Sequence, residues 1–330
     1  MALNLMPIAI LAFGTTCNST KVFMPMSELS FDQSFEAAHG RPVEVSPLVR
    51  RVTCKNPGPF TFKGTNSYIV GRGNVAIIDP GPEDDDHLAT LLDAVRGETV
   101  THIIITHTHR DHSPLARQLK AATGAATYGY GPHGAGRPAK AITSGDITLD
   151  AAGDHAFQPD VTVDHGEVIE GAGWCLEGVF TPGHCSNHLA FALPEERVLF
   201  SGDHVMAWST SVIAPPDGHM ADYFASLRTL MERADDKVYL PGHGPAKTEP
   251  QRFTRAFLGH RQMREKAVLQ RIRGGERTIM DVVRKVYAGV DPKLHNAAAL
   301  STLAHVEHLI EQGLVRAHGP LSIDTEYEAA

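Results

Sequence analysis

The stretch IIITHTHRDHS, residues 103–113, places four side chains that bind metal ions or protons within six positions. They are His107, His109, Asp111 and His112. An apolar, β-branched run comes directly before them and predicts a buried strand that ends where these side chains begin. Imidazole and carboxylate groups are ligands for zinc and related ions. Chance could produce such a cluster in a chain with 19 histidines, so ligands elsewhere in the chain are needed for a metal site.

Three later segments repeat one local plan: a short apolar strand, a tight turn and one ligand-type side chain. The segments GVFTPGH, VLFSGD and VYLPGHG carry His184, Asp203 and His243. A strand that ends in a turn holds its side chain with little freedom, as a metal site requires. Seven ligands exceed the four of one zinc ion but suit two ions that share a carboxylate. We expect His107, His109 and His184 at the first ion, Asp111, His112 and His243 at the second, and Asp203 bridging.

A site with two ions predicts hydrolytic chemistry. Such ions lower the pKa of a shared water to about 7 and polarise the scissile carbonyl or phosphoryl oxygen. Asp111 or Asp203 could accept a proton and orient the attacking water. His188, four residues after His184 in HCSNH, is the candidate general acid, with a position behind the ligands or at the rim of the site as the alternative. The expected ions are two zinc ions, with manganese or iron as alternatives.

The order of these motifs, HxHxDH followed by a single His, Asp and His, resembles the metallo-β-lactamase superfamily at all seven positions. Asp79 in IIDPG also matches an aspartate that supports the site in this family. The resemblance covers about residues 48–247. It implies an α/β fold, a four-layered αββα sandwich with the metal site at one edge. Cys185, beside His184, is interpreted as a small packed thiol.

The residue at the bridging position narrows the expected substrate. The commonest group of true β-lactamases has Cys there, whereas this chain has Asp203. The resemblance therefore implies a hydrolase of phosphodiesters or thioesters rather than of antibiotics.

The elements that must position these residues follow from apolar spacing and turn residues. Residues 87–96 predict a helix that ends at Gly97. Ser113 and Pro114 are expected to open a second helix as N-cap and first residue, and Gly124 to close it. A further helix is expected at about 222–233. Short strands between these helices predict sheets flanked by helices.

After Pro250 the pattern becomes helical. Residues 251–273 predict one helix, Thr278 caps a second, and residues 294–312 predict a third. A small hairpin over LVRAHGPLSID follows, and this order is typical of a winged helix. The expected organisation is an extension over 1–35, a catalytic domain over 36–250, a winged-helix-like domain over 251–320 and a tail over 321–330.

The terminal domain carries a clue to the substrate. Together with segments such as GTNSY, it resembles the β-lactamase-like protein 2 group from about residue 48 to 318, which implies cleavage of single-stranded RNA. Residues 250–318 contain 12 Lys and Arg against 6 Asp and Glu, whereas the remainder contains 18 against 32. This concentration of positive charge favours a polyanionic substrate. Residues 294–312 contain no Lys or Arg, so reading of duplex DNA is not expected.

Candidate substrate-binding residues lie in two groups. The basic residues are on the 251–273 helix, which should begin near the metal edge, although a solvated helix face would explain them equally well. Single-strand binding usually adds aromatic side chains, for which Phe60, Phe62, Tyr68 and Trp208 are the nearest candidates. The predicted substrate-binding residues are Asn66, Tyr68, Trp208, Arg261 and Arg264.

Three other functions remain open from the sequence. A glyoxalase-II-like thioesterase would use the same ions on a carbonyl group. An iron-dependent sulfur dioxygenase would need a single iron ion. A non-catalytic RNA-binding module would bind without turnover.

The composition sets broader limits. The 330 residues carry a net charge of −8 and are 42% hydrophobic, which is ordinary globular composition and excludes generic nucleic-acid binding through overall basicity. Four cysteines without a CxxC pair imply no disulfide framework, and a cytoplasmic location is expected. The apolar start MALNLMPIAILAFGTTC lacks a basic n-region and a cleavage site, so export is the less favoured alternative. No membrane association is expected.

Overall fold

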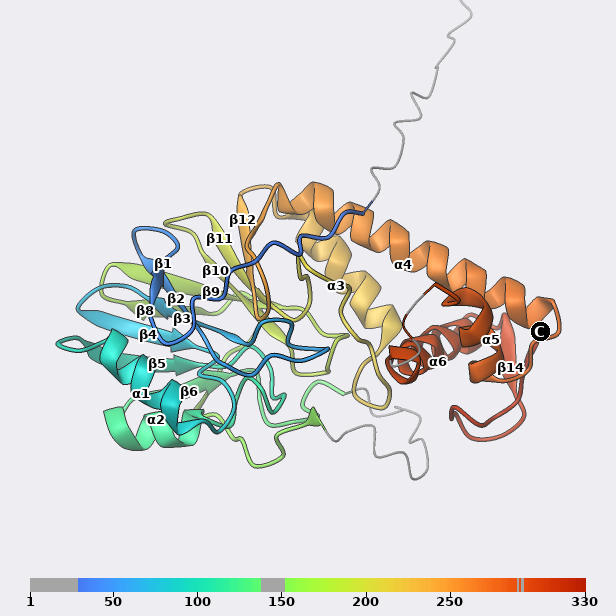
Figure 1. Ribbon diagram of the computed structural model, residues 1–330, viewed down its shortest axis with the longest axis horizontal. Helices are drawn as coiled ribbons and strands as arrows, with labels where there is room; N and C mark the ends of the chain where they lie inside the picture. Colours follow the sequence, from blue (N-terminus) through green and yellow to red (C-terminus); the bar gives the residue numbers. More distant parts are fainter. Residues whose placement is uncertain (1–28, 138–151, 290, 292–293) are drawn as a thin grey trace, which may run out of the picture.

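Two sheets form the centre of the molecule. Figure 1 shows the computed structural model, which describes residues 29–137, 152–289, 291 and 294–330. The first sheet runs in the order β1 to β7, and the second in the order β13-β12-β11-β10-β9-β8. The strands of the first sheet are β1 (Val43–Glu44), β2 (Val49–Thr53), β3 (Asn66–Val70), β4 (Asn74–Ile78), β5 (Thr99–Ile104), β6 (Ala126–Gly129) and β7 (Val161–Thr162). Those of the second are β8 (Val168–Gly171), β9 (Trp174–Phe180), β10 (Leu189–Leu193), β11 (Val198–Gly202), β12 (Val238–Pro241) and β13 (Lys247–Thr248).

The two sheets face each other and carry helices on their outer faces. Along β10, Leu189, Phe191 and Leu193 point into the core between the sheets, whereas Ala190 and Ala192 point to the outer face. This outer face packs against α3 (Met220–Glu232) and α4 (Pro250–Arg273). The outer face of the first sheet packs against α1 (Asp85–Ala94) and α2 (Ala116–Thr123). These layers confirm the predicted four-layered αββα sandwich.

The ligand-bearing strand ends meet at one edge because of strand direction. β4 pairs with β5 in parallel, and β11 pairs with β12 in parallel. Parallel neighbours end at the same edge of a sheet, so the residues that follow them are brought together. The residues after β5, β11 and β12 include His107, Asp203 and His243. The turn after β9 adds His184 to the same edge.

The start of α2 differs from the sequence prediction. The helix begins at Ala116, and its N-cap is Leu115 without a side-chain hydrogen bond. Ser113, the predicted N-cap, lies two residues before this position and donates its hydroxyl to Asp154 Oδ2 at 2.7 Å. Gly124 closes the helix with φ 77°, as predicted. The first helix begins at Asp85, two residues before the predicted position, because Asp84 caps it through the amide of His87.

The C-terminal domain contains three helices and a two-stranded sheet. α5 (Ile279–Val286), capped by Thr278 as predicted, and α6 (His295–Glu311) follow α4. β14 (Val315–Ala317) pairs with β15 (Tyr327–Ala329), so the second strand lies in the segment predicted to be a tail. The physical reason is Tyr327, which is only 1% exposed and packs into the domain core.

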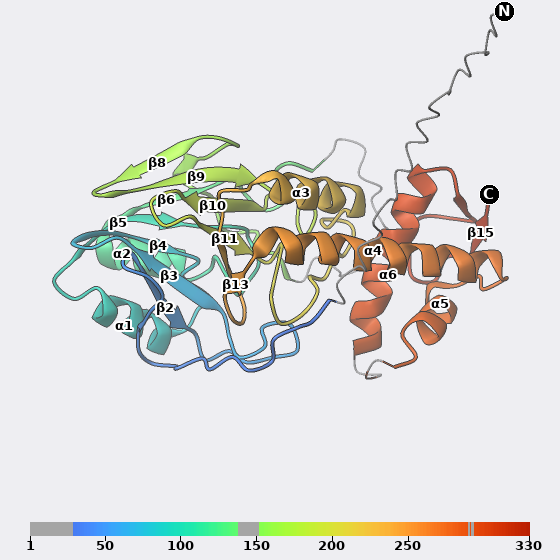
Figure 2. The same cartoon turned by 90° about the horizontal axis from the view of Figure 1, so that it is seen from above.

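Helix α4 belongs to both domains, which the predicted boundary at residue 250 did not anticipate. Phe253 and Phe257, in its first half, pack beneath the second sheet with α3. Val268 and Ile272, in its second half, pack with α5 and α6. Figure 2 shows this helix running from the sandwich into the C-terminal domain.

The predicted N-terminal extension is packed at its described end. The ring of Phe31 meets that of Phe257 edge to face, with centroids 6.4 Å apart. Leu29 packs against the same cluster. Residues 29–35 therefore belong to the catalytic domain, and the rest of the predicted extension lies outside the described residues. Among the described helices, none combines the length and apolar character needed to cross a membrane.

A charged contact also joins the two domains. His219, at the start of α3, meets Asp222 Oδ2 at 2.8 Å through Nδ1 and Glu311 Oε1 of α6 at 2.9 Å through Nε2. The hydrogen bond with Asp222 raises the pKa of His219 to about 9, against the opposing effect of burial and with help from Glu311. The neighbouring Glu307 is buried, and burial raises the pKa of its carboxyl to about 7.

Replacing Tyr327 tests whether the last residues are part of the fold. Tyr327→Ala should lower the free energy of unfolding by about 3 kcal/mol, because a large side chain leaves a buried site. Urea unfolding measures the change. Glu326→Ala is the matched control, since Glu326 is exposed and should leave stability unchanged. Equal stability of both variants would show that β15 contributes nothing.

The His219 contact predicts a pH dependence of stability. The folded-state pKa of about 9 exceeds the ordinary value of 6.5, so the stabilisation is complete below about pH 6.5 and is lost as pH rises toward 9. Wild type should exceed His219→Gln in unfolding free energy at pH 6, and the difference should shrink by pH 9.5. Urea unfolding across this range measures it. A difference that grows with pH would contradict the prediction.

Candidate metal centre

The structure brings all seven predicted ligands together at the edge where the strands end. In the first group, His109 Nδ1 lies 3.1 Å from both His107 Nε2 and His184 Nε2. His184 Nε2 lies 3.8 Å from Asp203 Oδ2. Two nitrogen ligands of a tetrahedral zinc ion, each about 2.0–2.1 Å from it, are about 3.3 Å apart. The spacing of this group therefore fits a bound divalent ion.

The second group lies on the other side of Asp203. His243 Nε2 is 3.1 Å from Asp111 Oδ2 and 3.3 Å from His112 Nε2. It is also 3.3 Å from Asp203 Oδ2, which connects the two groups. Asp203 Oδ1 is buried and makes no hydrogen bond within the described chain. A buried carboxylate oxygen without a partner is costly, and a cation at this position would satisfy it.

Hydrogen bonds behind the site hold four of the imidazole rings. His112 Nδ1 lies 2.9 Å from Asp79 Oδ2, and His184 Nδ1 lies 2.6 Å from the carbonyl of Val212. The remaining two contacts are His107 Nδ1 with Thr106 Oγ1 at 3.0 Å and His243 Nδ1 with the Gly64 carbonyl at 3.2 Å. With Nδ1 held in this way, each ring presents Nε2 to the site.

Asp79 has the supporting place expected of it. Its Oδ1 accepts the backbone N–H of Thr106 at 2.8 Å, and its Oδ2 accepts the Thr106 hydroxyl at 2.7 Å as well as facing His112. Asp79 adopts φ 49°, a left-handed conformation that costs roughly 1–2 kcal/mol for a residue with a Cβ. The bonds to Thr106 and His112 hold it there.

The charges of the site are arranged to attract cations. Burial alone would raise the pKa of Asp203, but His243 and His112 hold it well below its usual range. Burial would lower the pKa of His243, yet Asp203 and Asp111 raise it to about 9. The imidazoles of the first group stay neutral, because burial and neighbouring rings lower the pKa of His107 far below normal. The negative charge that attracts protons to the second group would also attract a divalent ion.

Glycine is needed beside the ligands, a requirement that the sequence motifs alone did not reveal. A Cβ at Gly242 would lie 2.5 Å from Asp203 Oδ1 and 2.6 Å from a ring carbon of His112. At Gly183, which has φ 129°, it would lie 2.3 Å from the backbone nitrogen of Tyr223. The sequence PGH, which ends at His184 and again at His243, could have signalled this close packing.

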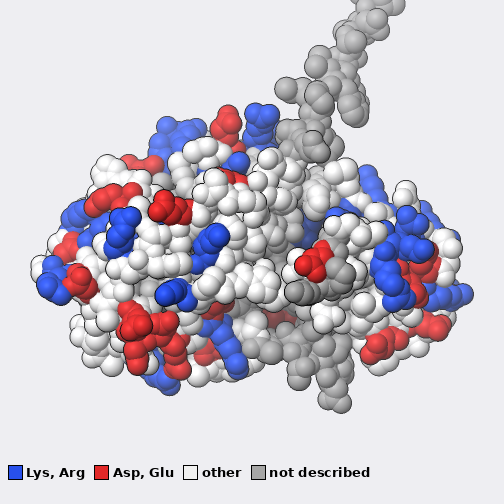
Figure 3. All heavy atoms as spheres, viewed as in Figure 1, with Lys and Arg blue, Asp and Glu red and all other residues white. Residues whose placement is uncertain are grey.

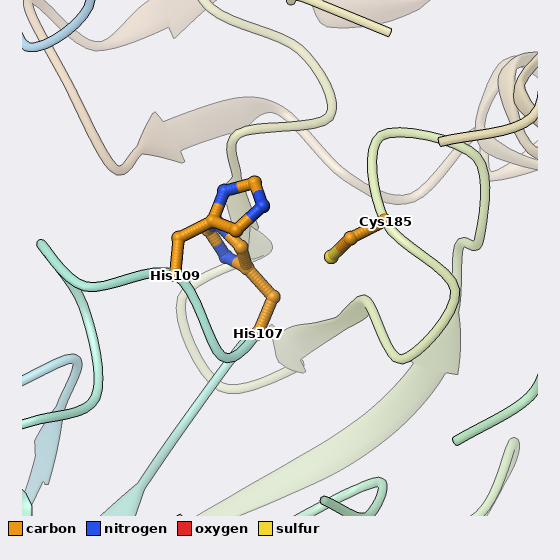
Figure 4. A group of neighbouring side chains, drawn as sticks. All are labelled: His107, His109 and Cys185. Atoms are coloured by element: carbon orange, nitrogen blue, oxygen red, sulfur yellow. The ribbon is translucent and has the colours of Figure 1, made fainter. Parts of the chain in front are cut away.

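Cys185 lies next to the first group, but its thiol contacts Asn187. Figure 4 shows its sulfur pointing toward His107 and His109, and the possible ligand atoms of the three residues lie within 4.8 Å of one another. The thiol is fully buried and contacts Asn187 Oδ1 at 3.4 Å. This placement agrees with the interpretation of a packed thiol.

The geometry contradicts the general-acid role predicted for His188. The ring is fully buried behind the ligands, 5.1 Å from that of His107. Its Nδ1 meets Thr181 Oγ1 at 2.8 Å, and its Nε2 accepts the backbone N–H of Asp203 at 3.2 Å. Both nitrogens are thus engaged, so His188 positions Asp203 and has no free proton for a leaving group.

Two residues predicted to bind substrate are instead structural. Asn66 is fully buried and donates to the carbonyls of Pro241 and Gly244, at 3.1 and 2.9 Å. The side chain of Tyr68 points into the core between the sheets and donates its hydroxyl to Pro241 at 2.8 Å. Both therefore fix the turn that carries His243, which corrects the prediction that they bind substrate.

The two predicted arginines also make internal contacts. Arg261 is 3% exposed, donates to the carbonyl of Ser211 and lies over the ring of Tyr223. Arg264 donates to the Val286 carbonyl at 2.7 Å and lies over Tyr287. These contacts tie α4 to its neighbours. The burial of Arg261 corrects the prediction that it binds substrate, whereas Arg264 is half-buried and its predicted role stays a prediction.

Other basic residues of α4 remain exposed. They are Arg252, Arg255, Lys266, Arg271 and Arg273. Figure 3 shows Lys and Arg side chains gathered at the C-terminal end of the viewed face, with some acidic residues among them. Trp208, the remaining predicted residue, is half-buried beside Gly244 and stacks on Phe62 with centroids 4.8 Å apart.

The comparisons with known proteins agree with this fold and site. The Metallo-beta-lactamase superfamily profile matches residues 60–243. The Beta-lactamase associated winged helix domain matches residues 278–320. The chain belongs to the metallo-β-lactamase superfamily, whose members are in general metal-dependent hydrolases, and it carries the winged-helix domain associated with them. The family resemblance and the fold predicted from the sequence are confirmed.

Individual relatives extend over most of the chain. It is 31% identical over 283 residues to the Beta-lactamase-like protein 2 homolog of Caenorhabditis elegans, covering 84% of this chain and 89% of the relative. It is 32% identical over 232 residues to an atrochrysone carboxyl ACP thioesterase of Cryptosporiopsis sp., covering 69% and 63%. A beta-lactamase domain protein from Burkholderia ambifaria has a similar structure, with TM-score 0.74, 22% identity and coverage of 90% and 96%.

Asp79→Asn tests the support behind the site. The change weakens the hydrogen bond to His112 and should reduce metal affinity by roughly 10- to 100-fold. Competition with a chelator measures the affinity, and circular dichroism checks the fold. Asp93→Asn, on the exposed surface of α1, is the matched control and should bind metal normally. Unchanged affinity in Asp79→Asn would mean that Asp79 does not position His112.

Proposed function

We propose that the protein is a hydrolase with two zinc ions that cleaves phosphodiester bonds of single-stranded RNA. The observation that carries the two-ion site is the pair of three-residue groups joined by Asp203. His107, His109 and His184 would hold one ion, and Asp111, His112 and His243 the other. Manganese or iron would fit the same nitrogen and oxygen ligands.

Bound ions would supply an activated water near neutral pH and polarise the scissile group. The side chains of the site would position the ions and accept the proton of the attacking water. Asp203, held by the contact between its N–H and His188, is directed between the two groups. Asp111 has a side chain that is 27% exposed, whereas that of Asp203 is 9% exposed. Asp111 is thus the more accessible carboxylate to accept a proton from the attacking water and orient it.

The RNA substrate is supported by charge and by resemblance. Five basic residues of α4 remain exposed, which suits a polyanion. The chain also resembles the β-lactamase-like protein 2 group along most of its length, and a homolog of that protein is among its relatives.

A thioester substrate is the second candidate. It is favoured by the similarity to a relative named as a carboxyl ACP thioesterase. The structure also favours a thioester substrate, because Arg261 is buried against Ser211 and is not available for a phosphate backbone. The same two ions would then act on a carbonyl group.

A paired assay separates these functions. Single-stranded RNA and a glutathione thioester are incubated separately with wild type and Asp203→Ala, with and without chelator. We expect wild type to cleave RNA, and either Asp203→Ala or chelator to abolish cleavage. Intact RNA together with a cleaved thioester would reverse the ranking. RNA binding that survives chelation, without turnover of either substrate, would indicate a non-catalytic module.

Elemental analysis tests the two-ion site. Wild type should contain about two equivalents of zinc, and His112→Ala and His243→Ala about one, because these residues serve one ion. One equivalent of iron in wild type, unaffected by these two changes, would instead favour the sulfur dioxygenase.

A further inference from the structure

An exposed loop beside the metal centre combines basic and aromatic side chains. It has the sequence KNPGPFTFK, residues 55–63, and lies between β2 and β3. Lys55 and Lys63 are exposed at its two ends. Phe60 is 55% exposed, which is unusual for a large apolar side chain in the described chain. Neither the metal site nor the core uses these three side chains.

The loop is held in one shape by its own hydrogen bonds. Gly58 and Phe62 form an antiparallel bridge, with N···O distances of 3.2 and 2.8 Å. The side chain of Asn56 closes the base of the loop through the backbone N–H and the hydroxyl of Thr65, at 2.9 and 3.0 Å. A loop ordered in this way can bind a ligand with little further loss of entropy.

The base of the loop contacts a predicted metal ligand. Thr65 forms an antiparallel bridge with His243, and the carbonyl of Gly64 faces His243 Nδ1 at 3.2 Å. Lys63 is two residues from Thr65, so their Cα atoms are at most about 7 Å apart. Lys63 therefore lies at the end of the loop that adjoins the turn carrying His243.

An aromatic contact links the loop to the turn that carries His243. Phe62 stacks on Trp208, and Trp208 lies against Gly244, the residue after His243. Lys63 Nζ lies over Phe62, 5.3 Å from the ring centroid. Phe62 has φ 55°, a strained conformation for a bulky residue and one often kept where function needs it. Stacking of Phe62 on Trp208 holds the loop, while Phe60 stays exposed.

We propose that residues 55–63, here called the platform loop, bind single-stranded RNA next to the metal centre. Lys55 and Lys63 contact phosphates, and a base stacks on Phe60. Positive side chains with an exposed aromatic ring are the combination that single-strand binding uses. The inference rests on the proposed RNA substrate, and it gives the platform loop the role that the buried Arg261 cannot fill.

Steady-state cleavage of a short single-stranded RNA by the zinc-loaded full chain tests the proposal. Phe60→Ala should raise KM by about 10-fold with little change in kcat, because a stacked base contributes to binding. Phe60→Trp should restore the wild-type KM. Lys63→Gln should reduce the salt dependence of binding, lowering the slope of log affinity against log salt by about 0.7.

The matched control is Val168→Ala. Val168 is 54% exposed on β8, in the other sheet, and its replacement should leave KM unchanged. RNAs with a single abasic position provide a second readout. At the position that stacks on Phe60, loss of the base should weaken wild type and leave Phe60→Ala unaffected. Equal KM values for wild type and Phe60→Ala on every RNA would overturn the proposal.

Equilibrium binding of the same RNA separates this inference from the proposed function. If wild type binds RNA without cleaving it, and Phe60→Ala binds about 10-fold more weakly, the platform loop stands and the proposed nuclease activity fails. If wild type cleaves RNA and the loop variants behave like Val168→Ala, the nuclease stands and the platform loop fails. No binding of RNA by wild type overturns both.

Discussion

The convergence of seven ligand side chains on one small volume is the constraint on which the rest of the structure depends. Imidazole nitrogens that face one another at about 3 Å cannot all keep their lone pairs satisfied without a proton or a cation between them. Asp203 and Asp111 add negative charge to this buried volume. The protein therefore needs a framework stiff enough to resist the mutual repulsion of these groups. Parallel strand ends, glycine turns and Asp79 behind His112 supply that stiffness.

Much of the metal site could be predicted from the sequence because each ligand is encoded locally. A strand of β-branched residues, a glycine turn and a histidine or aspartate are all visible within about ten residues. The strand direction then brings these local units to one edge. The four-layered sandwich was predicted through the family resemblance that these motifs carry, whereas the strand and helix pattern alone predicted only sheets flanked by helices.

Residues whose role depends on distant partners could not be assigned in this way. Tyr68 and Phe62 are both aromatic and lie six residues apart, yet Tyr68 points between the sheets whereas Phe62 stacks on Trp208 outside this core. Arg261 donates to the carbonyl of Ser211, 50 positions earlier in the chain. Ser113 was expected to cap a helix, but the helix begins at Ala116, and the Ser113 hydroxyl is donated to Asp154, 41 positions later. Residue type gave the chemistry of each side chain, and only tertiary structure gave its partner.

The bridge between Thr65 and His243 has a further consequence for how the molecule forms. This bridge joins the two sheets at the metal edge. The neighbouring contact between Gly64 and His243 connects positions 179 residues apart in the chain. Contacts between such distant positions form slowly, because a long loop must close first. Each sheet alone holds only part of the ligand set. High-affinity capture of both ions should therefore await the docking of the two halves, after which the ions would hold the sandwich closed.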